Sequence, residues 1–68
     1  MRVVLNGEPR DLPDGATAAD AVDASGAPDS RDGVAVAVDG EVVPRSRWGE
    51  HTLADGQKVE VLQAVQGG

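Results

Sequence analysis

The sequence predicts an α+β domain, in which one helix packs on one face of a mixed β-sheet. Valine supplies most of the bulky apolar side chains, and β-branched residues favour strands. Short apolar runs are separated by Asn-Gly and Asp-Gly pairs, which are turn signals. One segment, residues 17–25, has helical spacing instead. These three features indicate several short strands and one main helix.

The first segment, residues 2–6, is predicted to be a strand that enters a tight hairpin at Asn6-Gly7. Both central positions of a type I′ turn require positive φ, which asparagine and glycine tolerate. Residues 8–12 are expected to form the returning strand. Because Pro9 has no backbone N–H, this strand is expected at an edge of the sheet.

The helix is predicted to begin after Thr17, a suitable N-cap that follows a turn at residues 13–15. Asp20 lies three residues later, in the position of a capping-box acid. Gly26 and Pro28 predict where the helix ends. One face follows the i, i+3, i+4, i+7 spacing and consists of Ala18, Ala21, Val22 and Ser25.

A polar loop is expected at residues 27–33, before the second half of the sheet. The alternating valines of residues 34–38 predict a strand. Asp39-Gly40 predicts a turn into a short strand at residues 41–43, which Pro44 ends.

The last part of the chain is expected to be irregular over residues 45–52. After a turn at Asp55-Gly56, residues 58–64 are predicted to form the final strand. This strand and the first one, residues 2–6, are expected to lie side by side in the centre of the sheet.

Alternation along the strands predicts which side of the sheet the helix covers. Val34, Val36 and Val38 share one parity, as do Val59 and Val61, and these side chains are expected to face the helix. The opposite face would carry small and apolar residues with no helix over them. They are Val4, Ala35, Ala37, Leu62 and Ala64. An exposed apolar patch of this kind often marks an interface.

Composition excludes several functional classes. The chain has 68 residues, a net charge of −6 and no cysteine. An acidic surface repels phosphate backbones and favours basic protein partners, so nucleic acid is not expected as a partner. No apolar run approaches the roughly 18 residues of a membrane span. Met1-Arg2 leads directly into a strand pattern, so no signal peptide is expected. The lack of cysteine suits a reducing cytosol, and the expected location is cytoplasmic.

The sequence closes on Gly67-Gly68, directly after an apolar stretch at residues 59–65. Two residues without side chains make a thin tail on which a partner's cleft can close. We therefore expect a domain over residues 1–64 and a flexible tail over residues 65–68, whose terminal carboxylate is the working group. A carboxylate is a poor electrophile, and a partner that transfers AMP onto it would activate it. The chain itself has no cysteine nucleophile and no Walker-type phosphate loop.

The order of predicted elements and several motifs resemble the ThiS family, bacterial sulfur carriers of thiamine biosynthesis with a β-grasp, or ubiquitin-like, fold. The most specific motif is Val43-Pro44-Arg45 followed by Trp48, ahead of an Asp-Gly turn. The other matching segments are residues 34–39, 41–45, 53–56 and 59–68. Two features depart from the family pattern. The helix face carries alanine and valine rather than leucine, and the region of residues 24–33 is longer.

The resemblance implies a protein substrate rather than an enzyme, with no catalytic residue, metal or cofactor of its own. A ThiF-like, E1-type adenylating enzyme would use ATP to adenylate Gly68. A sulfur donor protein would convert the adenylate to a thiocarboxylate, which would pass its sulfur to the thiazole synthase ThiG. Val65, Gln66 and Gly67 would position the tail. Leu62 and Ala64, on the strand that leads into the tail, would contact the partner.

Three residues outside the tail are candidates for other roles. Trp48 is interpreted first as a core or edge plug in a domain without phenylalanine, and second as a partner contact, because tryptophan is enriched at interface hot spots. Arg45 either binds a partner carboxylate or makes a surface pairing. His51 has no cysteine or second histidine with which to share a metal, so neither metal binding nor catalysis is expected of it.

Other functions share this pattern. Within the carrier class they are a MoaD-like sulfur carrier for molybdopterin, a sulfur carrier for cysteine biosynthesis and a carrier for protein conjugation. Outside it, the chain would be a non-catalytic β-grasp interaction module whose Gly-Gly is incidental. Exposure to ATP, an adenylating enzyme and a sulfur donor distinguishes the two classes, because only a carrier exchanges an oxygen atom for sulfur.

Overall fold

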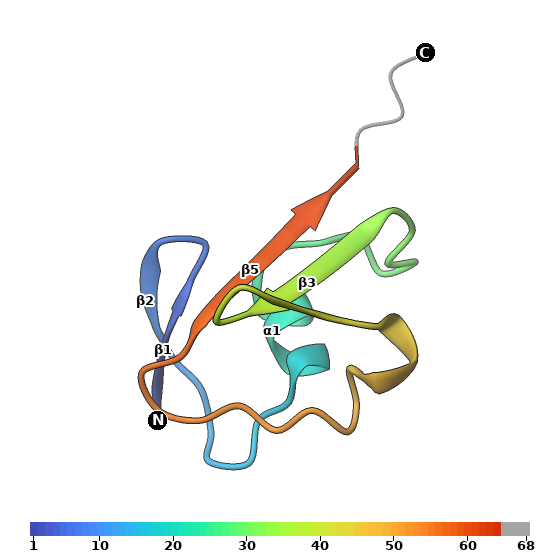
Figure 1. Ribbon diagram of the computed structural model, residues 1–68. Coiled ribbons are helices and arrows are strands. Elements are labelled where there is room, and N and C mark those ends of the chain that lie inside the picture. Colours follow the sequence, from blue (N-terminus) through green and yellow to red (C-terminus); the bar gives the residue numbers. More distant parts are fainter. Residues whose placement is uncertain (65–68) are drawn as a thin grey trace.

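The computed structural model describes residues 1–64 and shows one five-stranded sheet with one helix behind it (Figure 1). The strand order is β2-β1-β5-β3-β4. The elements are β1 (Arg2–Leu5), β2 (Glu8–Asp11), α1 (Ala18–Ala24), β3 (Val34–Val38), β4 (Glu41–Val43), the 3-10 helix η1 (Arg45–Arg47) and β5 (Lys58–Gln63). The predicted α+β architecture is confirmed.

In the centre of the sheet, the first strand of the chain lies beside the last. β1 and β5 run parallel, with Val4 opposite Lys58 and Leu5 opposite Val59, whereas the other neighbouring strands are antiparallel. β2, which contains Pro9, lies at an edge. Both placements were predicted. In Figure 1, β5 crosses the molecule diagonally between β1 and β3.

The strand bounds differ from the predicted ones by one residue at three places. β1 ends at Leu5 because Asn6, with φ 50°, already belongs to the turn. β2 ends at Asp11, although the Leu12 N–H still donates to the Met1 carbonyl at 2.9 Å. β5 ends at Gln63, one residue before the predicted end.

Helix α1 begins and ends as predicted. Thr17 is the N-cap, and its backbone N–H donates to the Asp20 carboxylate at 2.8 Å. Ser25 is the C-cap, and Gly26 follows with φ 84°. The buried side chains on the helix are Ala18, Ala21 and Val22. Because these side chains are small, the bulk of the core comes from the sheet and from Trp48.

The first interpretation of Trp48, as a core residue, is confirmed. Its side chain is 2% exposed, and its indole N–H donates to the Val43 carbonyl at 2.9 Å. The segment around it, which the sequence predicts to be irregular, includes η1. It also supplies hydrogen-bond acceptors to the N-terminus of α1. The Trp48 carbonyl accepts from the Ala19 N–H at 3.1 Å, and the His51 carbonyl accepts from the Ala18 N–H at 2.9 Å. Two of the N–H groups that a helix N-terminus leaves free are therefore satisfied here.

Candidate functional site

The face of the sheet opposite α1 is uncovered and carries exposed apolar side chains, as predicted. On the covered face, Val36, Val38, Val59 and Val61 are buried, and Val34 is half-buried against the core. On the uncovered face, Leu62 is 63% exposed. Ala35 and Ala64 are also exposed, and Val4 and Ala37 are half-buried. Val42, which sequence reasoning did not assign to this face, is 72% exposed.

The sheet register joins these side chains into one patch, here called the open face. Ala35 lies opposite Leu62, and Ala37 lies opposite both Glu60 and Val42. The patch therefore runs from β5 across β3 to β4. On the other side of β5, a hollow is lined by Val4, Asn6, Gly7, Lys58, Val59, Glu60 and Leu62.

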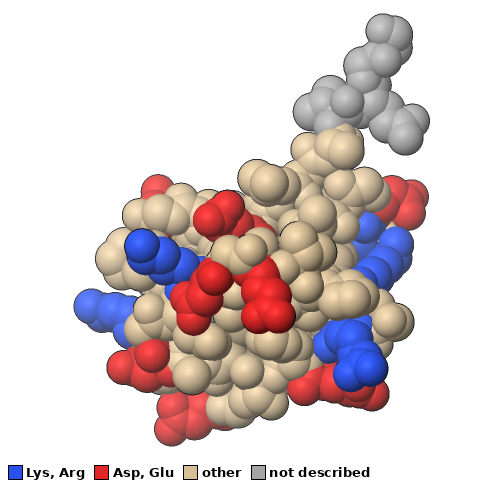
Figure 2. All heavy atoms as spheres, viewed as in Figure 1, with Lys and Arg blue, Asp and Glu red and all other residues tan. Residues whose placement is uncertain are grey.

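Charged groups interrupt the open face. Lys58 and Glu60 have the same parity on β5 as Leu62 and are exposed. In Figure 2, acidic side chains gather near the middle of the visible face, with a basic side chain beside them on the left. An apolar patch with both charges inside it suits a partner that presents apolar side chains together with complementary charges.

The predicted tail follows directly from this face. Gln63 and Ala64 are the last described residues, and the Ala64 N–H donates to the Gly33 carbonyl at 2.8 Å. The predicted tail residues Val65, Gln66, Gly67 and Gly68 lie outside the described residues. Two of the predicted contact residues, Leu62 and Ala64, are described. Both have exposed side chains on the open face.

Asn6 has a structural role that sequence reasoning missed, because the Asn-Gly pair indicated only a turn. Its side-chain amide takes both backbone hydrogen bonds of Val61. The Val61 N–H donates to Asn6 Oδ1 at 2.8 Å, and Asn6 Nδ2 donates to the Val61 carbonyl at 3.2 Å. The side chain thus extends the parallel β1–β5 ladder in the way that a backbone peptide would. It holds the strand that leads to the tail.

We expect Asn6→Gly to lower the free energy of unfolding by about 1–3 kcal/mol, because the partly buried Val61 peptide loses its partners. Asn6→Ala should cost roughly 1–2 kcal/mol more, since alanine is strained at the φ of 50° found here. Chemical denaturation of the two variants separates the hydrogen bonds from the strain. An Asn6→Gly variant as stable as the wild type would contradict this role.

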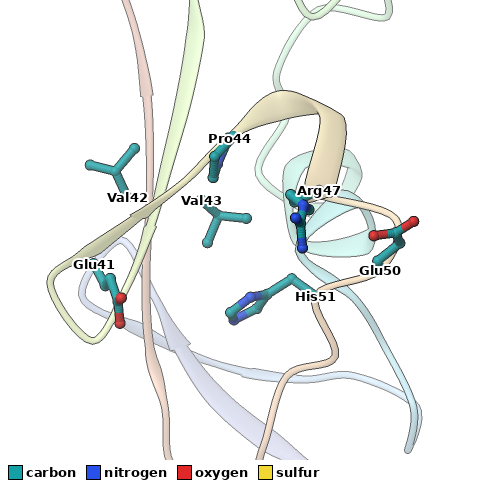
Figure 3. Close-up of a pocket in the computed structure, with 7 residues that line it drawn as sticks. All are labelled: Glu41, Val42, Val43, Pro44, Arg47, Glu50 and His51. Atoms are coloured by element: carbon teal, nitrogen blue, oxygen red, sulfur yellow. The ribbon is translucent and has the colours of Figure 1, made fainter.

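A second hollow lies beside the edge strand β4 (Figure 3). It is lined by Glu41, Val42, Val43, Pro44, Arg47, Glu50 and His51. The His51 ring points toward the β4 side, whereas the Glu50 carboxylate points away from it (Figure 3). β3 separates this hollow from β5. Its mixed charges form no evident acid–base or nucleophile–base pair.

The Arg45 side chain makes contacts within the domain, and its binding of a partner carboxylate stays a prediction. Its guanidinium donates to the Ser30 carbonyl at 3.0 Å and lies 5.9 Å from the centroid of the Trp48 ring. It therefore links η1 to the loop that follows α1. This contact spans 15 residues of sequence and could not be read from local pattern.

Electrostatic pairing is concentrated away from β5. Arg2 and Asp11 face each other across β1 and β2, with Nε and Oδ1 3.0 Å apart. The hydrogen bond from Arg2, and then its charge, lower the pKa of the Asp11 carboxyl, and the same contacts raise the pKa of Arg2. Both side chains are largely exposed, so the pair contributes little to stability.

Metal binding and membrane spanning can be judged for residues 1–64. No group of three histidine, cysteine, aspartate or glutamate side chains there is placed to hold a metal ion. No helix in this part of the chain is long and apolar enough to cross a membrane.

Comparison with known proteins identifies the family. The model of the ThiS family matches residues 3–68. The chain belongs to the ThiS family. The family match begins within β1 and continues past β5 to the Gly-Gly pair at the end of the sequence. The predicted family is therefore confirmed.

Two ThiS relatives support the assignment. The crystal structure of the thiamine biosynthesis protein ThiS from Geobacter metallireducens superposes with a TM-score of 0.79 at 27% identity, covering 100% of both chains. This likeness confirms the predicted β-grasp fold. The sulfur carrier protein ThiS of Escherichia coli is 36% identical over 36 residues, which are 53% of this chain and 54% of that protein. That alignment spans about half the length of the relative.

Proposed function

We propose that this chain is a sulfur carrier in thiamine biosynthesis, where it supplies the sulfur of the thiazole ring. The observation that carries the proposal is the family match, which runs from β1 through Gly68. The names of the two relatives agree with it: one is a sulfur carrier protein and the other a thiamine biosynthesis protein. The carrier is a substrate of other enzymes and does not itself catalyse the transfer.

The proposed chemistry takes place at the carboxylate of Gly68. An oxygen of this carboxylate attacks the α-phosphorus of ATP on an adenylating, ThiF-like partner, and pyrophosphate leaves. A persulfide sulfur from a donor protein then attacks the acyl carbon and AMP leaves. A thiol then attacks the donor sulfur of this acyl disulfide, forms a new disulfide with the donor, and the thiocarboxylate leaves. Thiazole synthase, ThiG, is the proposed acceptor, and the cytoplasm is the proposed location.

The chain's own contribution is to present the carboxylate. Leu62 and Ala64 lie on the open face at the end of β5 and are exposed. A partner that holds residues 65–68 would meet these side chains first. Gly67 leaves room for the partner's cleft to close on the backbone. Val65 and Gln66 are proposed to position the tail between the open face and the reacting carboxylate.

The test is the intact mass of the chain after incubation with ATP, a ThiF-like enzyme and a persulfide donor. Loading should raise the mass by the difference between one sulfur and one oxygen atom, and omission of ATP should prevent it. Transfer from the loaded chain to thiazole synthase then separates the thiamine pathway from the molybdopterin and cysteine alternatives. An unchanged mass with an active enzyme would favour a non-catalytic interaction module.

Leu62→Asp is expected to weaken binding to the adenylating enzyme by at least tenfold, about 1.4 kcal/mol. The new carboxylate would lose water without gaining a partner in that contact. The fold should survive, because the Leu62 side chain is 63% exposed. A binding titration measures the affinity, and circular dichroism checks the fold.

The matched control for this prediction is Ala54→Asp. Ala54 is exposed in the turn before the other end of β5, so the variant adds the same charge away from the tail. Its affinity should stay near that of the wild type. Equal losses in both variants would indicate a general effect of charge, and no loss in Leu62→Asp would place the partner surface elsewhere.

A further inference from the structure

The loop between α1 and β3 is held in an unusual backbone conformation. Arg31 has φ 58°, a left-handed value that is uncommon for a residue with a side chain, and Gly33 has φ 70°. Such conformations persist where the surroundings over-determine them, and they are concentrated at functional positions. These observations raise the question of what the loop holds in place.

Several contacts fix the loop to the rest of the domain. The Arg31 guanidinium pairs with Asp23 of α1 at 2.7 Å. The Arg31 N–H donates to the Pro28 carbonyl at 2.8 Å. From the other side, Arg45 donates to the Ser30 carbonyl at 3.0 Å. The loop is therefore tied both to the helix and to η1, and it ends at Gly33 in a defined place.

At that place the loop meets the end of the sheet. The Gly33 carbonyl accepts the hydrogen bond of the Ala64 N–H at 2.8 Å. A Cβ added to Gly33 would lie 3.3 Å from the Ala64 carbonyl oxygen and 3.7 Å from the Ala64 Cβ. At every other glycine among residues 1–64, an added Cβ would meet nothing within 4 Å. Gly33 is thus the one glycine in the described chain whose missing side chain makes room for another segment.

We infer that residues 26–33 form a positioning element that sets where the chain leaves β5, and that Gly33 is its positioning residue for the chemistry at Gly68. The inference rests on the proposed function. Four residues after Ala64 can span at most roughly 14 Å. A partner that grips the open face at Leu62 holds one end of this span, and its ATP lies at the other. A displaced Ala64 would therefore pull the carboxylate out of line.

The experiment compares Gly33→Ala with Gly40→Ala. Both glycines have positive φ, 70° and 82°, so both variants carry the same kind of backbone strain. Only the variant at Gly33 also presses a methyl group against Ala64. The first readout is hydrogen exchange of the Ala64 amide by NMR, which needs no partner enzyme. Exchange should be about tenfold faster in Gly33→Ala, because its hydrogen bond opens more often, and unchanged in Gly40→Ala.

The second readout is the steady-state rate of thiocarboxylation. In Gly33→Ala, kcat should fall roughly tenfold or more because the carboxylate is misplaced, whereas KM, set by the open face, should change less than about twofold. Gly40→Ala should leave both values near those of the wild type. A merely structural role for Gly33 would lower the folded fraction without this separation of kcat from KM.

The outcomes are distinguishable. Unchanged exchange at Ala64, unchanged kcat in a folded Gly33→Ala, or equal losses in the two glycine variants would overturn the inference. If the wild type is not thiocarboxylated, the proposed function fails, and the exchange comparison still decides whether Gly33 fixes Ala64. Should Gly33→Ala not fold, Asp23→Ala removes the partner of Arg31 from an exposed position. It should shift the Ala64 exchange in the same direction, and no shift would also overturn the inference.

Discussion

Deletion of Gly68 is expected to abolish sulfur loading while the domain stays folded. Adenylation needs a free carboxylate within reach of the ATP α-phosphate, and a misplacement of about 1 Å can already cost a hundredfold in rate. Removing one residue shortens the reach by roughly 3.3–3.6 Å, several times that tolerance. The buried core of the domain consists of side chains between Val3 and Val61, so the deletion removes none of it.

Two companion variants sharpen this prediction. One added C-terminal residue should abolish loading as well, because the carboxylate moves too far. Gly68→Ala keeps the length and the carboxylate and should retain part of the activity. Intact mass measures loading, and circular dichroism checks the fold. Full loading of the shortened chain, or of an extended chain shown to be unprocessed, would contradict a reaction at the Gly68 carboxylate.

The elements that could be predicted are those that depend on neighbouring residues. Asn6-Gly7 and Asp39-Gly40 are turns because both positions of each pair take positive φ, between 50° and 82°. Thr17 and Asp20 form a cap because they lie three residues apart. The open face follows from strand alternation alone. In each case, the physical cause lies within a few residues of its effect.

What could not be predicted depends on contacts between distant parts of the chain. The Asn6 side chain meets Val61 across 55 residues of sequence. The carbonyls that satisfy the first N–H groups of α1 come from Trp48 and His51. The role of Gly33 depends on Ala64, which no local pattern joins to it. Such pairs appear only when the sheet order and the register are known.

The chemistry proposed for the tail has a different basis from the fold. Residues 65–68 lie outside the described residues, and the function proposed for Gly68 depends on the family match. The structure supports it indirectly, since the exposed end of β5 carries an apolar face that no element of the described chain covers. The two glycine variants test the position of Ala64, and the Gly68 deletion tests the reaction itself.

Trp48→Ala is expected to remove a large part of the protein's free energy of unfolding. Removing a buried tryptophan side chain costs about 3–5 kcal/mol. At about 0.05–0.15 kcal/mol per residue, a domain of 68 residues has only about 3–10 kcal/mol in total. The indole is 2% exposed and is the largest side chain in the core. Its segment also supplies carbonyl acceptors to α1, so the helix N-terminus should loosen with it.

Trp48→Phe separates packing from hydrogen bonding at this site. Phenylalanine keeps much of the apolar volume, but the Val43 carbonyl loses its 2.9 Å bond from the indole N–H. We expect a loss of about 1–3 kcal/mol from that unpaired group, with the fold retained. Urea denaturation followed by circular dichroism measures both variants. If Trp48→Ala is destabilised no more than Trp48→Phe, the indole fills no essential volume, and the core is held by the valines of the sheet instead.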